Sequence, residues 1–119
     1  MTRRDDTHAS LRAAHERATR RLAGLTDTLD AIIDSSELAN LDDEHDPEGA
    51  TVGFERAQVT ALLDAARVQV QELEDALERL RNGTYGVCVR CGRDIPALRL
   101  EALPATRFCV ECATQPNAQ

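Results

Sequence analysis

The chain has 119 residues, a net charge of -7 at neutral pH and only 3% aromatic residues, with no tryptophan. So few aromatic side chains leave little material for a large apolar core, and helix packing or a bound metal must add stability. The acidic balance disfavours nonspecific binding to nucleic acid, which needs clustered cations to release counterions from phosphate. We expect a cytoplasmic protein, because the polar N-terminal residues do not form a signal peptide and no apolar run is long enough to span a bilayer.

Residues 9–40 predict a long helix. Apart from Gly24, this stretch contains no glycine and no proline. Apolar or small residues recur in alternating steps of four and three, which is the seam of a coiled coil. The seam positions are Leu11, His15, Ala18, Leu22, Leu25, Leu29, Ile32, Ser36 and Ala39. The polar residues 1–8 before this helix are expected to be disordered.

A second helix with the same spacing is predicted from about residue 51 to residue 81. Its seam positions are Val52, Val59, Leu63, Ala66, Val70, Leu73, Leu77 and Leu80. Residues 41–50, between the helices, predict an acidic turn, because Pro47 and Gly49 interrupt helices. Two long helices joined by a short turn pack antiparallel. Residues 9–82 therefore predict an antiparallel coiled-coil hairpin with an acidic tip at residues 41–50.

Four cysteines follow the hairpin in two matched pairs. Two residues separate Cys88 from Cys91, and two separate Cys109 from Cys112. This spacing lets one tight turn aim both sulfurs of a pair at a common point, and Gly92 supplies backbone freedom for the first turn. Two such turns offer four thiolates, which suit tetrahedral zinc. We expect these cysteines to hold one structural Zn²⁺ in a finger of residues 83–113, followed by a disordered tail at residues 114–119.

Other roles for the cysteines are weaker alternatives. A redox pair belongs in a thioredoxin-like βαβ context, an iron–sulfur cluster usually shows unequal spacings, and two disulfides would need an oxidising compartment. Four thiolates close the zinc shell, whereas a catalytic zinc keeps an open position. No nucleophile–base pair is recognisable elsewhere in the sequence. We therefore do not expect an enzyme.

The residues around the cysteines carry a further pattern. The positions that matter, besides the four cysteines, are Asp94, Ile95, Arg99, Leu100, Glu101, Ala102 and Pro104. Over about thirty residues this stretch closely resembles the zinc finger of the DksA/TraR family. A helical hairpin before the finger is also that family's arrangement. The resemblance implies an all-α protein, in which an antiparallel helical hairpin precedes a small C-terminal four-cysteine zinc finger.

The resemblance also implies a function. Proteins of this family bind bacterial RNA polymerase and insert the hairpin into its secondary channel, the pore through which nucleotides reach the active site. The acidic tip approaches the catalytic Mg²⁺, and initiation at selected promoters changes. The family's tip residues fall at Asp46, Glu48 and Ala50, with one residue fewer between the two acids and Glu as the second acid. An acidic tip on a long arm suits a cation-rich channel.

This sequence departs from the family at the positions that contact the alarmone ppGpp. The positions of the family's basic ppGpp contacts fall at Glu72, Leu103 and Ala113, none of which is basic. We therefore expect that ppGpp does not act through this protein in the family's manner. His15 on the seam and His45 in the acidic turn are interpreted as ordinary half-buried or solvated side chains.

Several alternatives remain open at the sequence level. The protein could be a zinc-stabilised coiled-coil interaction protein with an unrelated partner, or a DNA-binding finger, against which the net charge argues. The seam could pair two chains, but a hairpin supplies its own partner helix, so we favour a monomer. The finger's arginines could form internal ion pairs or contact an acidic polymerase surface; they are Arg90, Arg93, Arg99 and Arg107.

Overall fold

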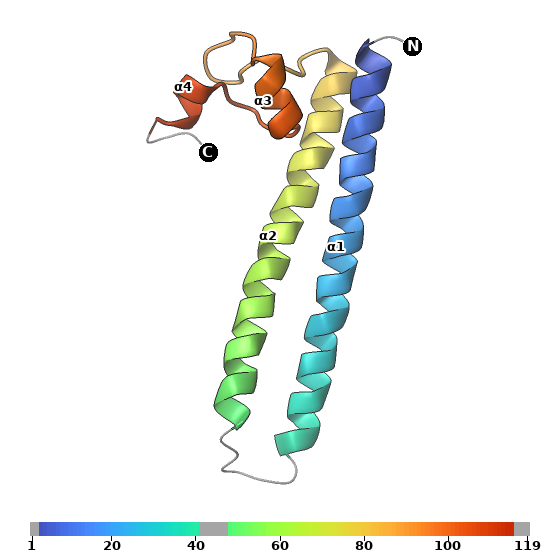
Figure 1. The fold of residues 1–119 in the computed structure, drawn as a ribbon, viewed down its shortest axis with the longest axis vertical. Coiled ribbons are helices and arrows are strands. Elements are labelled where there is room, and N and C mark those ends of the chain that lie inside the picture. Colours follow the sequence, from blue (N-terminus) through green and yellow to red (C-terminus); the bar gives the residue numbers. More distant parts are fainter. Residues whose placement is uncertain (1–2, 41–47, 116–119) are drawn as a thin grey trace. The chain divides into compact units, whose positions relative to one another are not determined.

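The computed structural model describes residues 3–40 and 48–115, with side chains from residue 5 to 37 and from residue 51 onward. Four helices follow one another: α1 (Arg3–Asn40), α2 (Glu48–Asn82), α3 (Ala97–Ala102) and α4 (Val110–Ala113). The two long helices form the antiparallel hairpin, and the cysteines follow it (Figure 1). Over the described ranges the sheet-like pairing is limited to an isolated antiparallel bridge between Val87 and Asp94. The all-α fold class is confirmed.

The chain divides into two compact units. One unit joins residues 1–16 to residues 70–119, and the other consists of residues 17–69. The first therefore contains the start of α1, the end of α2 and the whole cysteine region. Within the described residues, the second consists of the remaining lengths of the two long helices.

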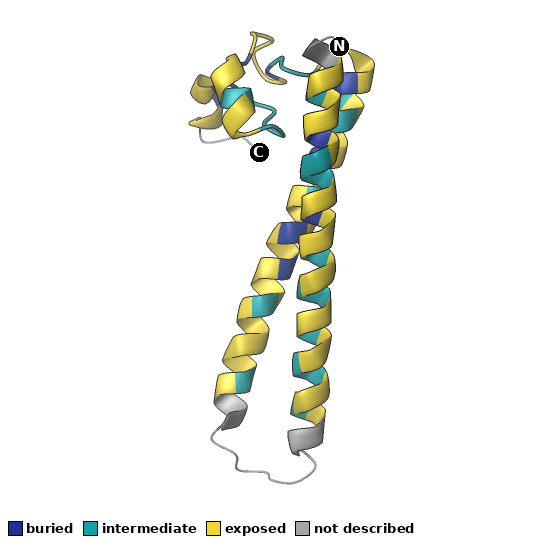
Figure 2. Ribbon diagram, turned by 45° about the vertical axis from the view of Figure 1, so that its right-hand side comes forward, coloured by how far each residue is buried: buried dark blue, intermediate teal, exposed yellow. Residues whose placement is uncertain are grey.

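The predicted seam is confirmed in both units. In residues 17–69, Ala18, Leu63 and Ala66 are buried, and the other seam positions with described side chains are half-buried (Figure 2). In the other unit, Leu11, Leu73 and Leu80 are buried. Burial of such side chains supplies the main driving force for pairing, at roughly 25 cal/mol per Å² of apolar surface. Ala76, which the four–three pattern omits, is also completely buried at 0% exposure.

The ends of the long helices differ from the prediction. Helix α1 begins at Arg3, so residues 3–8 are helical rather than disordered. Asp5 and Asp6 lie in its first turn, where carboxylates favour the positive end of the helix dipole. Helix α2 begins at Glu48, before the expected start near residue 51. Gly49 therefore lies in the first turn of α2 and not in the interior of the helix.

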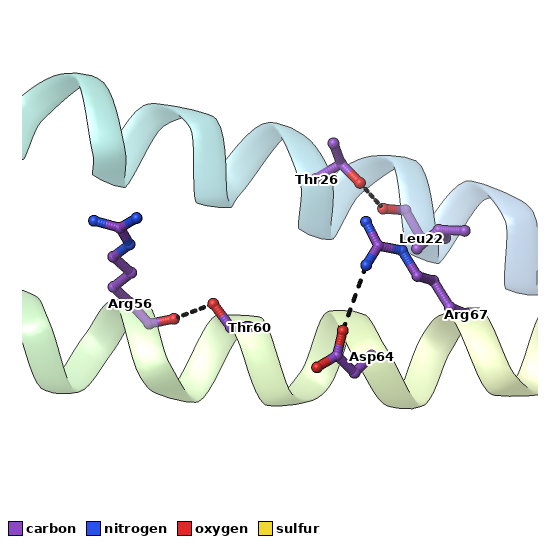
Figure 3. A network of polar contacts seen from close by, with 6 residues as sticks. All are labelled: Leu22, Thr26, Arg56, Thr60, Asp64 and Arg67. Carbon is purple, nitrogen blue, oxygen red and sulfur yellow. Dashed lines mark hydrogen bonds and ion pairs between the residues drawn. The ribbon is translucent and has the colours of Figure 1, made fainter.

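Three polar contacts in the unit of residues 17–69 lie within single helices and leave the apolar seam to hold α1 and α2 together. The Thr26 hydroxyl donates to the Leu22 carbonyl at 2.9 Å, and the Thr60 hydroxyl donates to the Arg56 carbonyl at 2.8 Å. Arg67 pairs with Asp64 at 3.4 Å (Figure 3). Each of these contacts stays within one helix, so none of them holds α1 to α2.

A polar contact does join the two helices in the other unit. His15 Nε2 lies 3.2 Å from Glu74 Oε1, with the imidazole half-buried on the seam. The interpretation of His15 as a half-buried seam residue is thereby confirmed. His45 lies outside the described residues. Over the described ranges, no helix is long and apolar enough to cross a membrane.

Candidate metal centre

The end of α2 sets the direction of the chain into the cysteine region. Gly83 has φ +78°, a left-handed conformation that glycine adopts without a steric penalty. Its N–H donates to the Leu80 carbonyl at 3.3 Å, and the Thr84 N–H donates to the Arg79 carbonyl at 2.9 Å. These bonds satisfy carbonyls that the last helical turn leaves open. Gly83 therefore ends α2.

The first cysteine pair occupies a tight turn. The Gly92 N–H donates to the Cys88 carbonyl at 3.0 Å, and the Cys88 N–H donates to the Arg93 carbonyl at 2.8 Å. Gly92 has φ +76°, which explains why the turn requires glycine directly after Cys91. The turn brings the sulfurs of Cys88 and Cys91 to the same side of the chain.

The second pair is placed by a single helical turn. Cys109 is the N-cap of α4, and the Ala113 N–H donates to the Cys109 carbonyl at 2.9 Å. Positions three apart lie on one face of a helix, so Cys109 and Cys112 point in the same direction. The ordered part of the finger extends beyond residue 113, its predicted end, because the Gln115 N–H donates to the Cys112 carbonyl at 3.2 Å. Residues 114 and 115 are therefore a turn rather than part of a disordered tail.

The two pairs meet. All four sulfur atoms lie within 4.8 Å of one another, and Cys91 Sγ is 3.8 Å from Cys109 Sγ. Four thiolates around zinc at about 2.3 Å would lie about 3.8 Å apart, whereas a disulfide bond is about 2.05 Å long. The cluster therefore has the size of a tetrahedral zinc site, and none of the four cysteines is in a disulfide.

The surroundings shift the pKa values of two of the four thiols in opposite directions. Backbone N–H groups, first that of Cys91, lower the pKa of the Cys88 thiol to about 6. Burial and the neighbouring sulfurs raise the pKa of the Cys112 thiol to about 12. Four thiolates in one small volume repel each other, and a divalent cation among them supplies the compensating charge. The donor set thus fits a metal that prefers thiolates.

A small apolar core supports the cysteines. Ile95 is buried against them, and Leu100 and Phe108 pack on the same cluster. Arg99 Nε donates to the Phe108 carbonyl at 2.9 Å. The Arg107 guanidinium lies 5.4 Å from the centre of the Phe108 ring, a cation–π distance. These contacts fix the segment that leads into Cys109.

Two further residues, which the sequence analysis did not single out, secure the same segment. The Tyr85 hydroxyl donates to the Pro104 carbonyl at 2.8 Å, and Arg79 Nη2 donates to the Ala105 carbonyl at 3.3 Å. Burial raises the pKa of Tyr85 and lowers that of Arg79. The signal that could have found Tyr85 is an aromatic next to Gly86 in a chain with hardly any aromatics.

Three of the finger's arginines, Arg93, Arg99 and Arg107, make contacts within the finger. Arg93 forms an ion pair with Glu111 at 3.4 Å, which links the two cysteine turns. Both side chains are largely exposed, so this pair adds little stability. Arg99 and Arg107 contact a carbonyl and a ring instead.

The structure describes only part of the predicted tip, which consists of Asp46, Glu48 and Ala50. Asp46 lies outside the described residues. The backbone of Glu48 and Ala50 lies in the first turn of α2.

Comparison with known proteins identifies the cysteine region. Residues 83–115 match the family described as the prokaryotic dksA/traR C4-type zinc finger. The chain carries a DksA/TraR zinc finger. Together with the cluster of four cysteines, this membership gives the chain one structural zinc ion as its cofactor, as predicted.

Similar proteins extend the match beyond the finger. The chain is 50% identical over 46 residues to an uncharacterised protein of Aquifex aeolicus, which covers 39% of this chain and 32% of that protein. It is 33% identical over 51 residues to the RNA polymerase-binding transcription factor DksA of Salmonella typhi, covering 43% of this chain and 34% of the relative. The matched region thus spans about a third of the length of these curated relatives.

A solved structure shares the fold. The transcription factor DksA2 from Pseudomonas aeruginosa matches with a TM-score of 0.75 and 23% identity. The match covers 91% of this chain and 78% of that one. The likeness confirms the helical hairpin fold.

Proposed function

We propose that Cys88, Cys91, Cys109 and Cys112 each supply one thiolate to the zinc ion. The support is the common size of the cluster and of a tetrahedral four-sulfur shell. Four protein ligands leave no position for water or substrate, so the metal stabilises the finger and performs no catalysis. Its binding free energy contributes directly to the folding of residues 83–115.

We infer that the protein regulates transcription by binding RNA polymerase. The observation that carries this inference is the combination of a DksA/TraR finger with the hairpin fold of DksA2. The relative from Salmonella typhi is by its name an RNA polymerase-binding transcription factor. The protein acts in the cytoplasm on polymerase itself, not on a DNA sequence, in keeping with its net charge of -7.

The hairpin is the part that reaches the enzyme's interior. In this proposal a single chain inserts α1 and α2 into the secondary channel, so that Asp46, Glu48 and Ala50 approach the catalytic Mg²⁺. Carboxylates near a Mg²⁺ site change its charge and ligand balance, which offers a physical route to altered initiation. Because Glu72, Leu103 and Ala113 replace the family's basic ppGpp contacts, ppGpp does not act through this protein in the family's manner.

Binding is tested with purified core polymerase. The zinc-loaded protein should be retained by core polymerase, and a cleavage factor that occupies the secondary channel should displace it. Retention without displacement would contradict channel insertion. Failure to bind polymerase at all would leave a zinc-stabilised coiled-coil protein with an unrelated partner.

The tip is tested by multi-round transcription. Asp46→Asn combined with Glu48→Gln should leave polymerase binding unchanged but abolish the effect on transcript output. Asp34→Asn combined with Glu37→Gln removes the same charges from exposed positions of α1 and serves as the matched control. Equal activity of both double variants would contradict a role for the tip acids. Adding ppGpp should change none of these results.

A further inference from the structure

An apolar stripe runs along α2 on the side away from α1. It consists of Phe54, Ala57, Ala61, Ala65 and Val68, all of them exposed and all within the unit of residues 17–69. At 3.6 residues per turn, Ala61 lies roughly 170° around the helix from the midpoint of Leu63 and Ala66, which face α1. The α2 stripe is therefore a second apolar face, distinct from the seam of the hairpin.

Helix propensity alone does not account for the α2 stripe. Alanine is common on helix surfaces because it favours helix formation, but phenylalanine and valine are poorer helix formers. Phe54 is nevertheless 73% exposed and Val68 57% exposed. With these two large side chains at its ends, the alanine row forms an apolar face on which a partner could pack.

The spacing of the α2 stripe is symmetric. Phe54 and Val68 lie seven residues on either side of Ala61, and Ala57 and Ala65 lie four residues on either side. Reversing the chain direction therefore superimposes large ends on large ends and alanines on alanines. A two-fold interface needs such a self-complementary patch, and small central residues let two helices approach closely.

The charges around the α2 stripe also suit an identical partner. Gln58, Leu62 and Gln69 border it on one side and carry no charge. On the other side, Asp64 is paired with Arg67 at 3.4 Å. Figure 3 shows that Arg67 and Arg56 extend toward α1, away from the α2 stripe. A nearly neutral apolar face makes few favourable contacts with nucleic acid or with a strongly charged surface. The same face on a second copy of the chain is equally apolar and nearly neutral, so the two faces are compatible.

We propose that a second copy of this chain packs antiparallel on the α2 stripe, with the two-fold axis at Ala61. Phe54 of each copy then contacts Val68 of the other. The α2 stripe is only about 21 Å long at 1.5 Å per residue, so the contact falls short of the roughly 1,200 Å² that stable complexes bury. The dimer is therefore weak, and it gives way to a single chain when α1 and α2 engage a larger partner.

Sedimentation velocity of the zinc-loaded protein, from about 1 μM to about 1 mM, tests the proposal. The wild type should dimerise reversibly within that range. Phe54→Glu and Val68→Arg should each raise the dimer dissociation constant about tenfold or more, because each places a charge against an apolar side chain. The double variant should dimerise nearly as well as the wild type, because antiparallel pairing sets each Glu against an Arg.

Leu98→Glu is the matched control, since it places a charge on an apolar side chain that is 79% exposed but lies on α3. It should leave dimerisation unchanged, and zinc content and melting temperature should show that all variants fold. A wild type that stays monomeric throughout, single variants that dimerise normally, or a double variant without recovery would each overturn the proposal. A monomeric wild type whose binding to core polymerase falls with Phe54→Glu would assign the α2 stripe to polymerase instead.

Discussion

The Tyr85 hydroxyl donates a hydrogen bond to the Pro104 carbonyl at 2.8 Å, across 19 residues of sequence. Tyr85 stands just before the first cysteine pair, and Pro104 follows α3 on the way to the second. Burial raises the pKa of Tyr85, so the hydroxyl stays protonated and remains a donor. The bond closes the loop that brings the two cysteine pairs together.

Tyr85→Phe should therefore weaken the finger without removing its metal. The substitution leaves the Pro104 carbonyl without its donor, at a cost of about 1–2 kcal/mol. Chemical denaturation of the zinc-loaded protein measures the loss. Thr60→Ala, which removes an exposed hydroxyl bonded within α2, is the control and should have a much smaller effect. Equal stability of Tyr85→Phe and wild type would contradict this role for the hydroxyl.

Removing zinc should unfold the finger while most of the hairpin stays helical. The finger's own core is confined to a few apolar residues around the cysteines, whereas residues 17–69 have a separate seam. Tyr85 is the only tyrosine and there is no tryptophan, so intrinsic fluorescence reports on the finger alone. Chelation should change Tyr85 emission with a small loss of helical circular dichroism. Emission that is unchanged after zinc has been removed would contradict a structural metal.

Zinc affinity should fall as the pH falls. The Cys88 thiol, with a pKa lowered to about 6, is ionised at neutral pH. It becomes protonated as the pH falls through 6, and protons then compete with zinc for this sulfur. The Cys112 thiol, with a pKa raised to about 12, must release its proton to the solvent when zinc binds. Binding therefore releases protons at neutral pH and more of them below pH 6. Competition with a chromophoric chelator at several pH values measures this, and a pH-independent affinity would contradict it.

The hairpin should depend on its seam and not on neighbouring exposed residues. Leu63 is 2% exposed, and Leu63→Ala should lower the free energy of unfolding by about 2–4 kcal/mol through the cavity it leaves. Leu62 is 43% exposed, so Leu62→Ala should cost well under half as much. Thermal or urea unfolding followed by circular dichroism compares the two. Similar losses in both variants would mean that the α1-facing side of α2 is assigned wrongly.

Two glycines should respond to alanine in opposite directions. Gly92 has φ +76°, so Gly92→Ala should destabilise the first cysteine turn by about 1 kcal/mol or more. Gly24 lies within α1 with open space around its Cα, so Gly24→Ala should stabilise the helix by about 1 kcal/mol. Differential scanning calorimetry of both variants measures the two shifts. Shifts in the same direction would contradict the assigned backbone conformations.

Much of this arrangement follows from local sequence rules. The four–three spacing placed Leu11, Leu63 and Leu73 on the seam because helical periodicity is a local property. The cysteine pairs and Gly92 predicted the metal turns because two-residue spacing fixes the geometry of each turn. The start of α1 does not follow from the four–three spacing, because Asp5 and Asp6 favour a helix N-terminus only weakly and lie before the first seam residue.

The contacts between distant parts of the chain were harder to predict. The burial of Ala76 depends on which residues of the partner helix lie opposite, and periodicity carries no such information. The hydrogen bonds from Tyr85 to the Pro104 carbonyl and from Arg79 to the Ala105 carbonyl depend on the path of the loop after α3. Such long-range contacts require the folded positions of segments that are about twenty residues apart.

The claim that four cysteines close around one structural zinc can be tested directly by native mass spectrometry of protein purified without added metal or chelator. We expect one zinc per chain, with unmodified cysteines that alkylating reagents reach only after the metal is removed. A metal-free chain, or cysteine sulfurs joined to one another as disulfides, would contradict it.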